Sequence, residues 1–507
     1  MRFLRIFFSR TILVIFSILL QLALLFYLIL KPSNYYIFQS VGLILCFFVL
    51  INMLSKNQCP EFKLPWLLII IVFPLAGTVL YFLLANRKLS FKQERLLSRV
   101  RKNSSLTKNA TKENPSLKKQ FKEDFPLEQY LISTTNTFAH ANNKITYFSS
   151  GDEFFSQLKT QLSKAQKFIF MEYFIIANGI VWEEIHSILK EKTRQGVDVR
   201  ILYDDIGSLG RVKTKFYKLL QKEKINCIKF NPFKPILTGI HNNRDHRKIT
   251  VIDGKIAFTG GINIADEYAG ISKPLGEWKD SAIMIEGSAV TDVTRTFLEN
   301  FDYSSKTTSN YERYLNQPHK SYQEKGLIHF FGDAPKPFES EFIGENNYIN
   351  IINNAKRYVY ITTPYLIVDY SFLQALKNAS LKGVDVRIIT PSIPDKKIVF
   401  NVTRSHYKHL LQKGVKIYEY SPGFIHSKTL ICDGKIAFVG TINLDYRSFA
   451  HHFECGALLY KTPCIKEIKN DFDEIFSKSK QITKETFRMN KLASLLNSIL
   501  AIFFPVL

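Results

Sequence analysis

The sequence contains few cysteines and no cysteine pair at a spacing typical of metal sites. Six cysteines occur in 507 residues, and none belongs to a Cys-x-x-Cys motif. A disulfide-rich scaffold and a cysteine-based zinc site are therefore not expected. Free thiols in a reducing compartment fit this composition best.

Acidic residues are scarce relative to basic ones. The chain has 44 Asp and Glu against 68 Lys and Arg, so its formal net charge is +24. Such an excess suits a nucleic acid, an anionic lipid surface or simple solubility. No aromatic-basic RNA-binding module is visible, so we do not expect nucleic acid as a partner.

Charge is absent from three long N-terminal runs, residues 11–30, 35–54 and 64–85. Each run is long enough to cross a hydrocarbon core of about 30 Å. A cleaved signal peptide is not expected, because no small-residue cleavage site follows the first run. Buried core helices would carry polar stripes, which these runs lack. We therefore predict a transmembrane region over residues 1–85, which makes the chain integral to the membrane.

The segment after the third run is strongly basic. By the positive-inside rule, it places the large C-terminal portion on the cytoplasmic side of the membrane. Arg2, Arg5 and Arg10 would then lie outside, against the rule. Either the first run lies at the interface, or the larger downstream charge sets the orientation, and we favour the second. The same basic residues are expected to attract anionic lipid. They are Arg87, Lys88, Lys92, Arg95, Arg99, Arg101 and Lys102.

The rest of the chain contains an internal repeat. Gly196-Val-Asp-Val-Arg-Ile201 reappears at residues 383–388, and Gly254-Lys-Ile-Ala-Phe258 reappears at residues 434–438. The order is kept while the offset drifts, as loop insertions between the strands of a repeat would produce. Each copy predicts strand, helix, strand, helix and then a hairpin. This alternation indicates two tandem α/β domains with an α/β/α layered architecture.

The predicted boundaries follow from these patterns. The first α/β domain occupies residues 136–330 and the second occupies residues 331–480. A basic juxtamembrane linker covers residues 86–135, because the stretch from about 103 to 125 is rich in Lys, Ser, Asn and Thr and lacks apolar periodicity. Residues 481–507 form a C-terminal amphipathic segment, which either packs on the α/β domains or lies on the bilayer surface.

Both repeats contain the pattern His-x-Lys-x-x-x-x-Asp followed by Gly-x-x-Asn. Two copies with a matched downstream pattern are not plausibly accidental. They indicate one active site built from two halves of the chain, which a pseudo-two-fold axis would relate. The candidate residues are His246, Lys248, Asp253 and Asn263 in the first copy, and His426, Lys428, Asp433 and Asn443 in the second.

The paired His and Lys suit attack on an anionic phosphodiester. Side chains on a strand alternate with period two, so the His and Lys of each copy share a face. The Lys neutralises the non-bridging oxygens, while one His attacks phosphorus and the other transfers a proton. No metal or other cofactor is needed. The histidine pairs His241 with His246 and His451 with His452 lack a third donor at ligand spacing.

The acidic and amide candidates are assigned supporting roles around the histidines and lysines. Asp253 and Asp433 belong to the motif and hence to the candidate catalytic set, but they fall in predicted Asp-Gly turns at odd spacing from the His. Turn formation is therefore favoured for them. Asp280 and Glu454, on later predicted strands, are candidates to orient the histidines. Asn263 and Asn443 are predicted to contact the substrate phosphate.

On these motifs the chain resembles bacterial cardiolipin synthases of the phospholipase D superfamily, from about residue 35 to the C terminus. The resemblance rests on residues 243–253 with 260–264, on residues 426–433, and on Gly440-Thr-Ile-Asn-Leu-Asp-Tyr-Arg-Ser448. It implies two tandem phospholipase D-like domains. The chain differs from the family pattern at His452, where Asn is common.

The resemblance also implies a reaction. Two phosphatidylglycerol molecules would give cardiolipin and glycerol through a covalent phosphatidyl-histidine intermediate. His246 would be the nucleophile and His426 the general acid and base. A hydrolytic phospholipase D that uses the same residues, and a phospholipase D-family nuclease, are the alternatives.

Overall fold

A computed structural model describes residues 10–31, 35–56, 59–85, 89–106, 119, 121–135, 137–233 and 242–506. The chain divides into two compact units, each treated by itself below. The first comprises Met1–Leu89, Phe233–Asn243 and Ser498–Leu507, and the second comprises Ser90–Pro232 and Arg244–Asn497.

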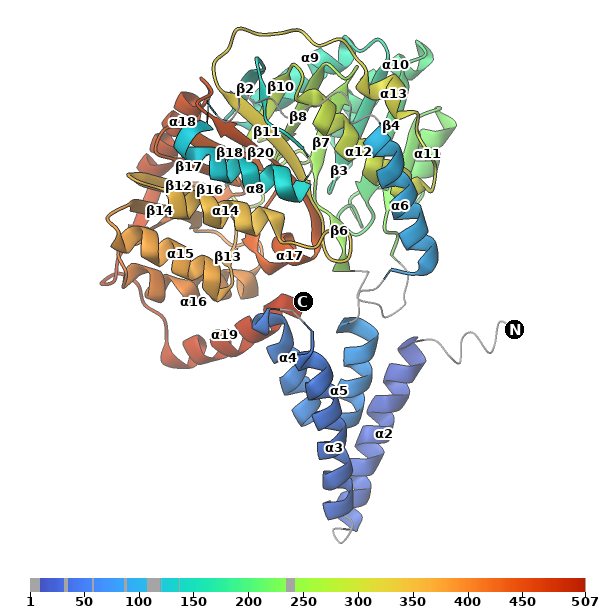
Figure 1. Ribbon diagram of the computed structural model, residues 1–507, viewed down its shortest axis with the longest axis vertical. Helices are drawn as coiled ribbons and strands as arrows, with labels where there is room; N and C mark the ends of the chain where they lie inside the picture. The colour runs from blue at the N-terminus through green and yellow to red at the C-terminus, as the bar shows by residue number, and fades with distance from the viewer. Residues whose placement is uncertain are drawn as a thin grey trace. The chain divides into compact units, whose positions relative to one another are not determined.

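The first unit is helical (Figure 1). A small core of Val49, Met53, Trp66, Ile70 and Tyr81 holds its helices together. Within the described part of the chain, no helix combines the length and apolarity of a membrane span. The three transmembrane helices predicted from the sequence are therefore not confirmed. The elements are α2 (Arg10–Leu30), α3 (Tyr35–Leu54), α4 (Pro60–Val72), α5 (Pro74–Leu80), the π-helix η2 (Tyr81–Ala85) and the 3-10 helix η6 (Phe504–Val506).

The run 64–85 does not form the single helix that was predicted. Helix α4 ends at Val72, and Phe73 adopts a non-helical conformation with φ −128° and ψ 75°. Pro74 explains the break, because proline has no N–H to donate and disfavours the helical conformation of the residue before it. Gly77 then lets α5 lie against the backbone of α4, where any Cβ would collide.

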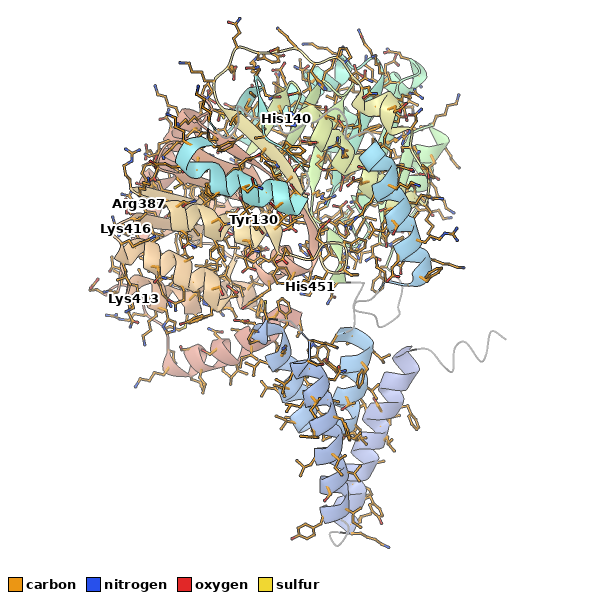
Figure 2. The ribbon with its side chains drawn as sticks, in the orientation of Figure 1. Tyr130, His140, Arg387, Lys413, Lys416 and His451 are labelled. Atoms are coloured by element: carbon orange, nitrogen blue, oxygen red, sulfur yellow. The ribbon has the colours of Figure 1, made fainter. Side chains whose placement is uncertain are left out.

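The segment 86–135 is more ordered than the predicted linker. It contains α6 (Phe91–Leu106), η4 (Lys122–Asp124) and α8 (Phe125–Thr135). Leu127 and Leu131 of α8 are buried in a large core, and Tyr130 packs against it (Figure 2). Leu127 and Leu131 are spaced i, i+4, which places both on the face of α8 that meets the core. Residues 86–88, 107–118 and 120 of the predicted linker lie outside the described residues.

The first α/β layer of the second unit is a seven-stranded sheet in the order β2-β10-β8-β7-β3-β4-β5. Helices α9, α10 and α11 bury their apolar side chains on one of its faces, while α12 contacts β3, β5, β7 and β8. The strands are β2 (Lys144–Phe148), β3 (Phe168–Tyr173), β4 (Asp198–Asp204), β5 (Asn226–Phe230), β7 (Lys248–Ile252), β8 (Ile256–Gly260) and β10 (Ala282–Glu286). The helices are α9 (Gly151–Ser163), α10 (Ile180–Arg194), α11 (Phe216–Lys222), α12 (Val290–Ser305) and α13 (Tyr311–Leu315).

The second sheet runs β1-β11-β20-β18-β17-β12-β14-β15-β21. Helices α8, α14, α15 and α16 cover one face, and α18 contacts β15, β17, β18 and β21. The strands are β1 (His140–Ala141), β11 (Leu327–Asp333), β12 (Tyr358–Thr362), β14 (Asp385–Pro391), β15 (Lys416–Tyr420), β17 (Thr429–Cys432), β18 (Ile436–Gly440), β20 (His452–Tyr460) and β21 (Ser479–Ile482). The helices are α14 (Ile343–Asn354), α15 (Tyr370–Leu381), α16 (Lys397–Leu411), α17 (Tyr446–Ala450), α18 (Ile465–Ser477) and α19 (Lys491–Phe503).

The two α/β halves exchange short strands. β6 (Arg244–Asp245), which follows the first half's sheet strands, pairs in parallel with β20 of the second half. Reciprocally, β16 (Gly423–Ile425) pairs in parallel with β9 (Glu277–Lys279) of the first half. β11 runs across the predicted boundary between residues 330 and 331, and β1 joins the second sheet. The halves therefore form a tandem α/β pair with matched, reciprocal contacts.

Both motif hairpins turn at Asp-Gly. Asp253 and Gly254 have φ of 54° and 65°, and Asp433 and Gly434 have φ of 53° and 71°. A two-residue hairpin with positive φ at both central positions is the type I′ geometry that Asp-Gly favours. The predicted turns are therefore present in both halves.

Candidate active site

His246 lies between β6 and β7, where the first half meets β20 of the second. Its backbone N–H donates to the Phe453 carbonyl at 2.9 Å. Its ring Nδ1 lies 2.9 and 3.0 Å from the two carboxylate oxygens of Glu454. The residue that orients this histidine thus comes from the other half of the chain.

His426 has the reciprocal surroundings. It follows β16, and its backbone N–H donates to the Lys279 carbonyl at 2.7 Å. Its Nδ1 lies 2.6 Å from Oδ2 of Asp280, which belongs to the first half. A carboxylate on Nδ1 fixes the ring and directs Nε2 away from it. Each half therefore orients the histidine of the other, and both predicted orienting carboxylates lie in contact with a histidine.

Burial and positive neighbours keep both imidazoles neutral. Burial, followed by the charges of Lys248, Lys428 and His426, lowers the pKa of His246 well below its ordinary value. Burial and Lys428 lower the pKa of His426 to about 4, against the opposing pull of Asp280. A neutral ring with a carboxylate on Nδ1 is the form that can attack an electrophile through Nε2.

The two lysines are held beside the histidines. Lys248 Nζ donates to the His246 carbonyl at 2.5 Å, and Lys428 Nζ donates to the His426 carbonyl. Burial lowers the pKa of Lys248 to about 8 and the pKa of Lys428 to about 7, although Glu454 and Asp280 raise both. The lowered pKa values show that the nearby carboxylates do not fully offset the burial of the two ammonium groups. A bound phosphodiester anion would add the negative charge that stabilises them.

Asp253 and Asp433 lie away from this chemistry. The Asp253 carboxylate accepts backbone N–H groups of Gln166, Lys167 and Phe168 at 2.7–2.9 Å. The Asp433 carboxylate accepts those of residues 356–358 at 2.7–2.9 Å. Each carboxylate ties the hairpin turn to the start of the neighbouring strand. These contacts support the turn-forming role that was favoured for both residues.

The two asparagines differ in what they contact. Asn263 is fully engaged within its own half, since Oδ1 accepts from the Ile175 N–H at 3.0 Å and Nδ2 donates to the Tyr268 hydroxyl at 2.7 Å. The side-chain oxygen Oδ1 of Asn443 is buried and has no hydrogen-bond partner among the described residues. Asn443 is therefore the member of the pair with bonding capacity left for a substrate.

One donor set near the site has the composition of a metal centre. A ring nitrogen of His246, a ring nitrogen of His452 and a carboxylate oxygen of Glu454 all lie within 4.8 Å of one another. The charges of Lys248 and Lys428 that lower the pKa of His246 would also repel a cation. This electrostatic setting favours an anionic ligand. His241, which the sequence also raised as a donor, lies outside the described residues.

Several supporting residues were missed from the sequence. Arg247, between the two motif residues, donates from Nε to the Glu454 carbonyl at 2.9 Å and from a terminal nitrogen to the Asp333 carbonyl at 3.0 Å. Thr441 donates from its hydroxyl to Glu454. A buried ion pair between Arg244 and Asp204 at 2.9 Å holds β6 in place. The charge of the arginines offered a signal, but their partners lie 40 to 207 residues away.

Family models and a curated relative match most of the chain, including the site described above. The chain matches the family model described as cardiolipin synthase, PLD-like domain over residues 158–302 and 348–476, and the model described as phospholipase D-nuclease N-terminal over residues 41–86. A cardiolipin synthase of Geobacillus sp. strain WCH70 is 35% identical over 89% of this chain and 90% of its own length. The chain belongs to the cardiolipin synthase family of phospholipase D-like proteins.

The chain is also similar to a second curated protein and to a solved structure. An uncharacterized protein of Streptococcus mutans serotype c is 42% identical over 87% of this chain and 96% of its own length. The fold is similar to that of phosphatidylserine synthase from Haemophilus influenzae, with a TM-score of 0.59, 14% identity, and coverage of 75% of this chain and all of that one. The two segments that match the cardiolipin synthase domain contain both histidines, both lysines and both orienting carboxylates described above.

Proposed function

We propose that this protein is a cardiolipin synthase that joins two phosphatidylglycerol molecules and releases glycerol. The observation that carries the proposal is the reciprocal pair of buried histidines, His246 on Glu454 and His426 on Asp280. Each ring is neutral, fixed at Nδ1 and close to a lysine. Family membership supports the lipid substrate, and the geometry supports transfer at phosphorus.

The first step forms a covalent intermediate. Nε2 of His246 attacks the phosphorus of one phosphatidylglycerol, a P–N bond forms, and the P–O bond to the headgroup glycerol breaks. His426, protonated when the anionic substrate is bound, gives its proton to the departing glycerol oxygen. General acid catalysis of this kind contributes on the order of 10²–10⁴ in rate. Lys248 and Lys428 neutralise the non-bridging oxygens.

The second step regenerates the enzyme. The free glycerol hydroxyl of a second phosphatidylglycerol gives its proton to the now neutral His426 and attacks phosphorus. The P–N bond breaks, His246 is released, and cardiolipin leaves. Water in place of the lipid hydroxyl would give phosphatidic acid, so exclusion of water decides between synthase and hydrolase.

Lipid contact by the N-terminal helices would supply both substrates at high local concentration. Helices α2 and α3 are mostly apolar, with Arg10, Gln21 and Asn52 among their few polar residues, and they expose large side chains. This exposure supports insertion in a bacterial cell membrane, with the basic residues after residue 86 and the α/β domains on the cytoplasmic side. The exposed side chains include Phe16, Leu19, Leu22, Phe26, Leu43 and Phe48.

A product assay tests the proposal. The purified protein is incubated with radiolabelled phosphatidylglycerol, and the lipids and released glycerol are separated over time. Cardiolipin and glycerol in equal amounts are expected. Phosphatidic acid without cardiolipin would instead establish a hydrolytic phospholipase D. A His426→Ala protein, purified in the same way, controls for contaminating activity.

A further inference from the structure

Helix α19 lies near the C terminus (Figure 1). Its apolar side is exposed. Five of its six large aliphatic side chains follow the spacing i, i+3, i+4, i+7 and i+8, which places them on one helical face. All five are exposed, by 40 to 63%. A helix in water normally turns such a face inward. The side chains are Leu492, Leu495, Leu496, Ile499 and Leu500.

The opposite side of α19 is polar or small and faces inward. Asn497 is buried, and its Nδ2 contacts the Met489 sulfur at 3.9 Å. Ser494 and Ala501 lie one turn away on the same side and are half-buried. The usual arrangement of an amphipathic helix is therefore reversed. An apolar environment outside the protein would remove this conflict.

The charged residues that directly precede or begin α19 are basic apart from Glu485. Lys484, Arg488 and Lys491 precede or begin the helix, and no acidic residue follows Glu485. A basic flank next to an aliphatic face suits anionic headgroups above acyl chains. It suits a second copy of the same basic segment poorly, because like charges would then face each other.

The residues that follow α19 pack against the helical core of the first unit. Val506, just beyond α19, packs against the core of the first unit that contains Trp66 and Ile70. Helix α4 of that unit exposes Ile71 and Val72 by 64% each. The C-terminal segment thus joins helices that themselves present uncovered apolar side chains.

We propose that α19 is an interfacial helix that lies in the surface of an anionic phospholipid bilayer, with its aliphatic face among the acyl chains. This contact is separate from the chemistry of the two histidines. It rests on the proposed function only for the choice of phosphatidylglycerol in the test membranes. The helix would hold the α/β domains at the membrane surface from their C-terminal end, in addition to the N-terminal helices.

A spin label placed on the exposed face tests the contact directly. In the full chain with Cys46→Ser and Cys59→Ser, a nitroxide is attached at Leu496→Cys. The matched control is Leu381→Cys, at the end of α15, where the leucine is 65% exposed. In phosphatidylglycerol vesicles, the accessibility of the Leu496 label to a water-soluble nickel complex should fall about tenfold and its accessibility to oxygen should rise. The control label should stay in water.

Two results would overturn the proposal. One is equal nickel accessibility of the two labels in vesicles. The other is protection of the Leu496 label from both reagents in detergent without vesicles, in proportion to protein concentration, which would show a second copy on this face. Neither result depends on turnover, so failure of the phosphatidyl transfer reaction is scored separately.

A pair of variants measures the functional consequence. Leu496→Glu with Ile499→Glu should lower turnover on phosphatidylglycerol vesicles about tenfold, because two charges would enter the apolar face. Turnover on detergent-dispersed phosphatidylglycerol should be unchanged, and Leu381→Glu should affect neither assay. An equal loss in both assays, or no loss on vesicles, contradicts an interfacial role.

Discussion

The two halves of the active site share a backbone plan but differ in the side chains around each histidine. His426 contacts Asp280 at 2.6 Å through one carboxylate oxygen. His246 lies at nearly equal distances from both oxygens of Glu454, which also accepts from Thr441. The reciprocal strand pairs give both histidines the same backbone setting. The two sites differ in the carboxylate: Asp280 contacts its histidine through one oxygen, whereas Glu454 is shared between His246 and Thr441.

The residue two positions before the orienting carboxylate also differs between the two halves. In the first half it is Trp278, whose ring centroid lies 5.8 Å from that of His426. In the second half it is His452, 5.3 Å from His246, with Nδ1 3.4 Å from Glu454 and too distant for a strong hydrogen bond. The two histidines thus have equivalent backbone settings but different neighbours, which fits the proposal that one acts as nucleophile and the other moves protons.

The largest effect is expected from removing either histidine. His246→Ala and His426→Ala should each lower kcat about 10⁴-fold, and the double variant should be no worse than the more damaged single one, since residues that act as a unit are not additive. Steady-state turnover on phosphatidylglycerol measures this. His409→Ala, at an exposed position on α16, is the control. Multiplicative losses would show that the halves act independently.

The orienting carboxylates should differ in importance. Asp280→Asn should lower kcat on the order of 10²–10³-fold, because its single short contact carries the imidazolium of the proton-transfer step. Glu454→Gln should cost about tenfold, since the amide can still accept from His246, which stays neutral. The ratio of the two kcat values is the measurement. Equal losses would contradict different roles for the two halves.

The lysines predict the alkaline limb of the pH profile. The charged ammonium is the active form, and it is lost as pH rises through the lowered pKa of about 7 for Lys428 and about 8 for Lys248. kcat/KM should therefore fall above pH 7 to 8. On the acid side, the depressed pKa of His246 keeps its ring neutral below pH 6.5. Lys428→Arg should move the alkaline limb upward, because arginine stays charged. A limb unchanged in that variant would assign it to another group.

The smallest effect on catalysis is expected at the two hairpin turns. Asp253→Asn and Asp433→Asn should each lower the free energy of unfolding by about 1–3 kcal/mol, because strong hydrogen bonds to buried backbone N–H groups are weakened. Turnover per folded molecule should stay within about twofold. Thermal unfolding and active-site titration separate the two quantities. A loss of kcat without a loss of stability would return these residues to the catalytic set.

The sequence predicted the local parts of this site well. The histidines, the lysines and the Asp-Gly turns follow from a repeated motif whose residues are close along the chain. Asp280 and Glu454 could be named as candidates, but which histidine each would serve could not, because the crossing of β6 to β20 and of β16 to β9 joins residues 146 and 208 positions apart. Period-two alternation carries no information on such a crossing.

Other features depended on packing that composition does not show. Helix α8 falls within the segment predicted as a linker, and the break at Phe73 depends on Pro74 within a long apolar run. The sequence placed Asn263 and Asn443 in the same role, whereas the Tyr268 hydroxyl occupies the amide of one and not the other. Hydrophobic pattern predicts which face is apolar, but not which neighbour covers it.

In the proposed mechanism, His246 forms the covalent bond to phosphorus and His426 transfers protons. Rapid denaturation of the enzyme during turnover at alkaline pH, where phosphohistidine survives, followed by peptide mass mapping, tests it most directly. A phosphatidyl adduct on the peptide that contains His246, absent from His246→Ala and retained on His426→Ala, is the predicted result. An adduct on His426 would reverse the two roles, and the absence of any adduct would contradict the covalent mechanism.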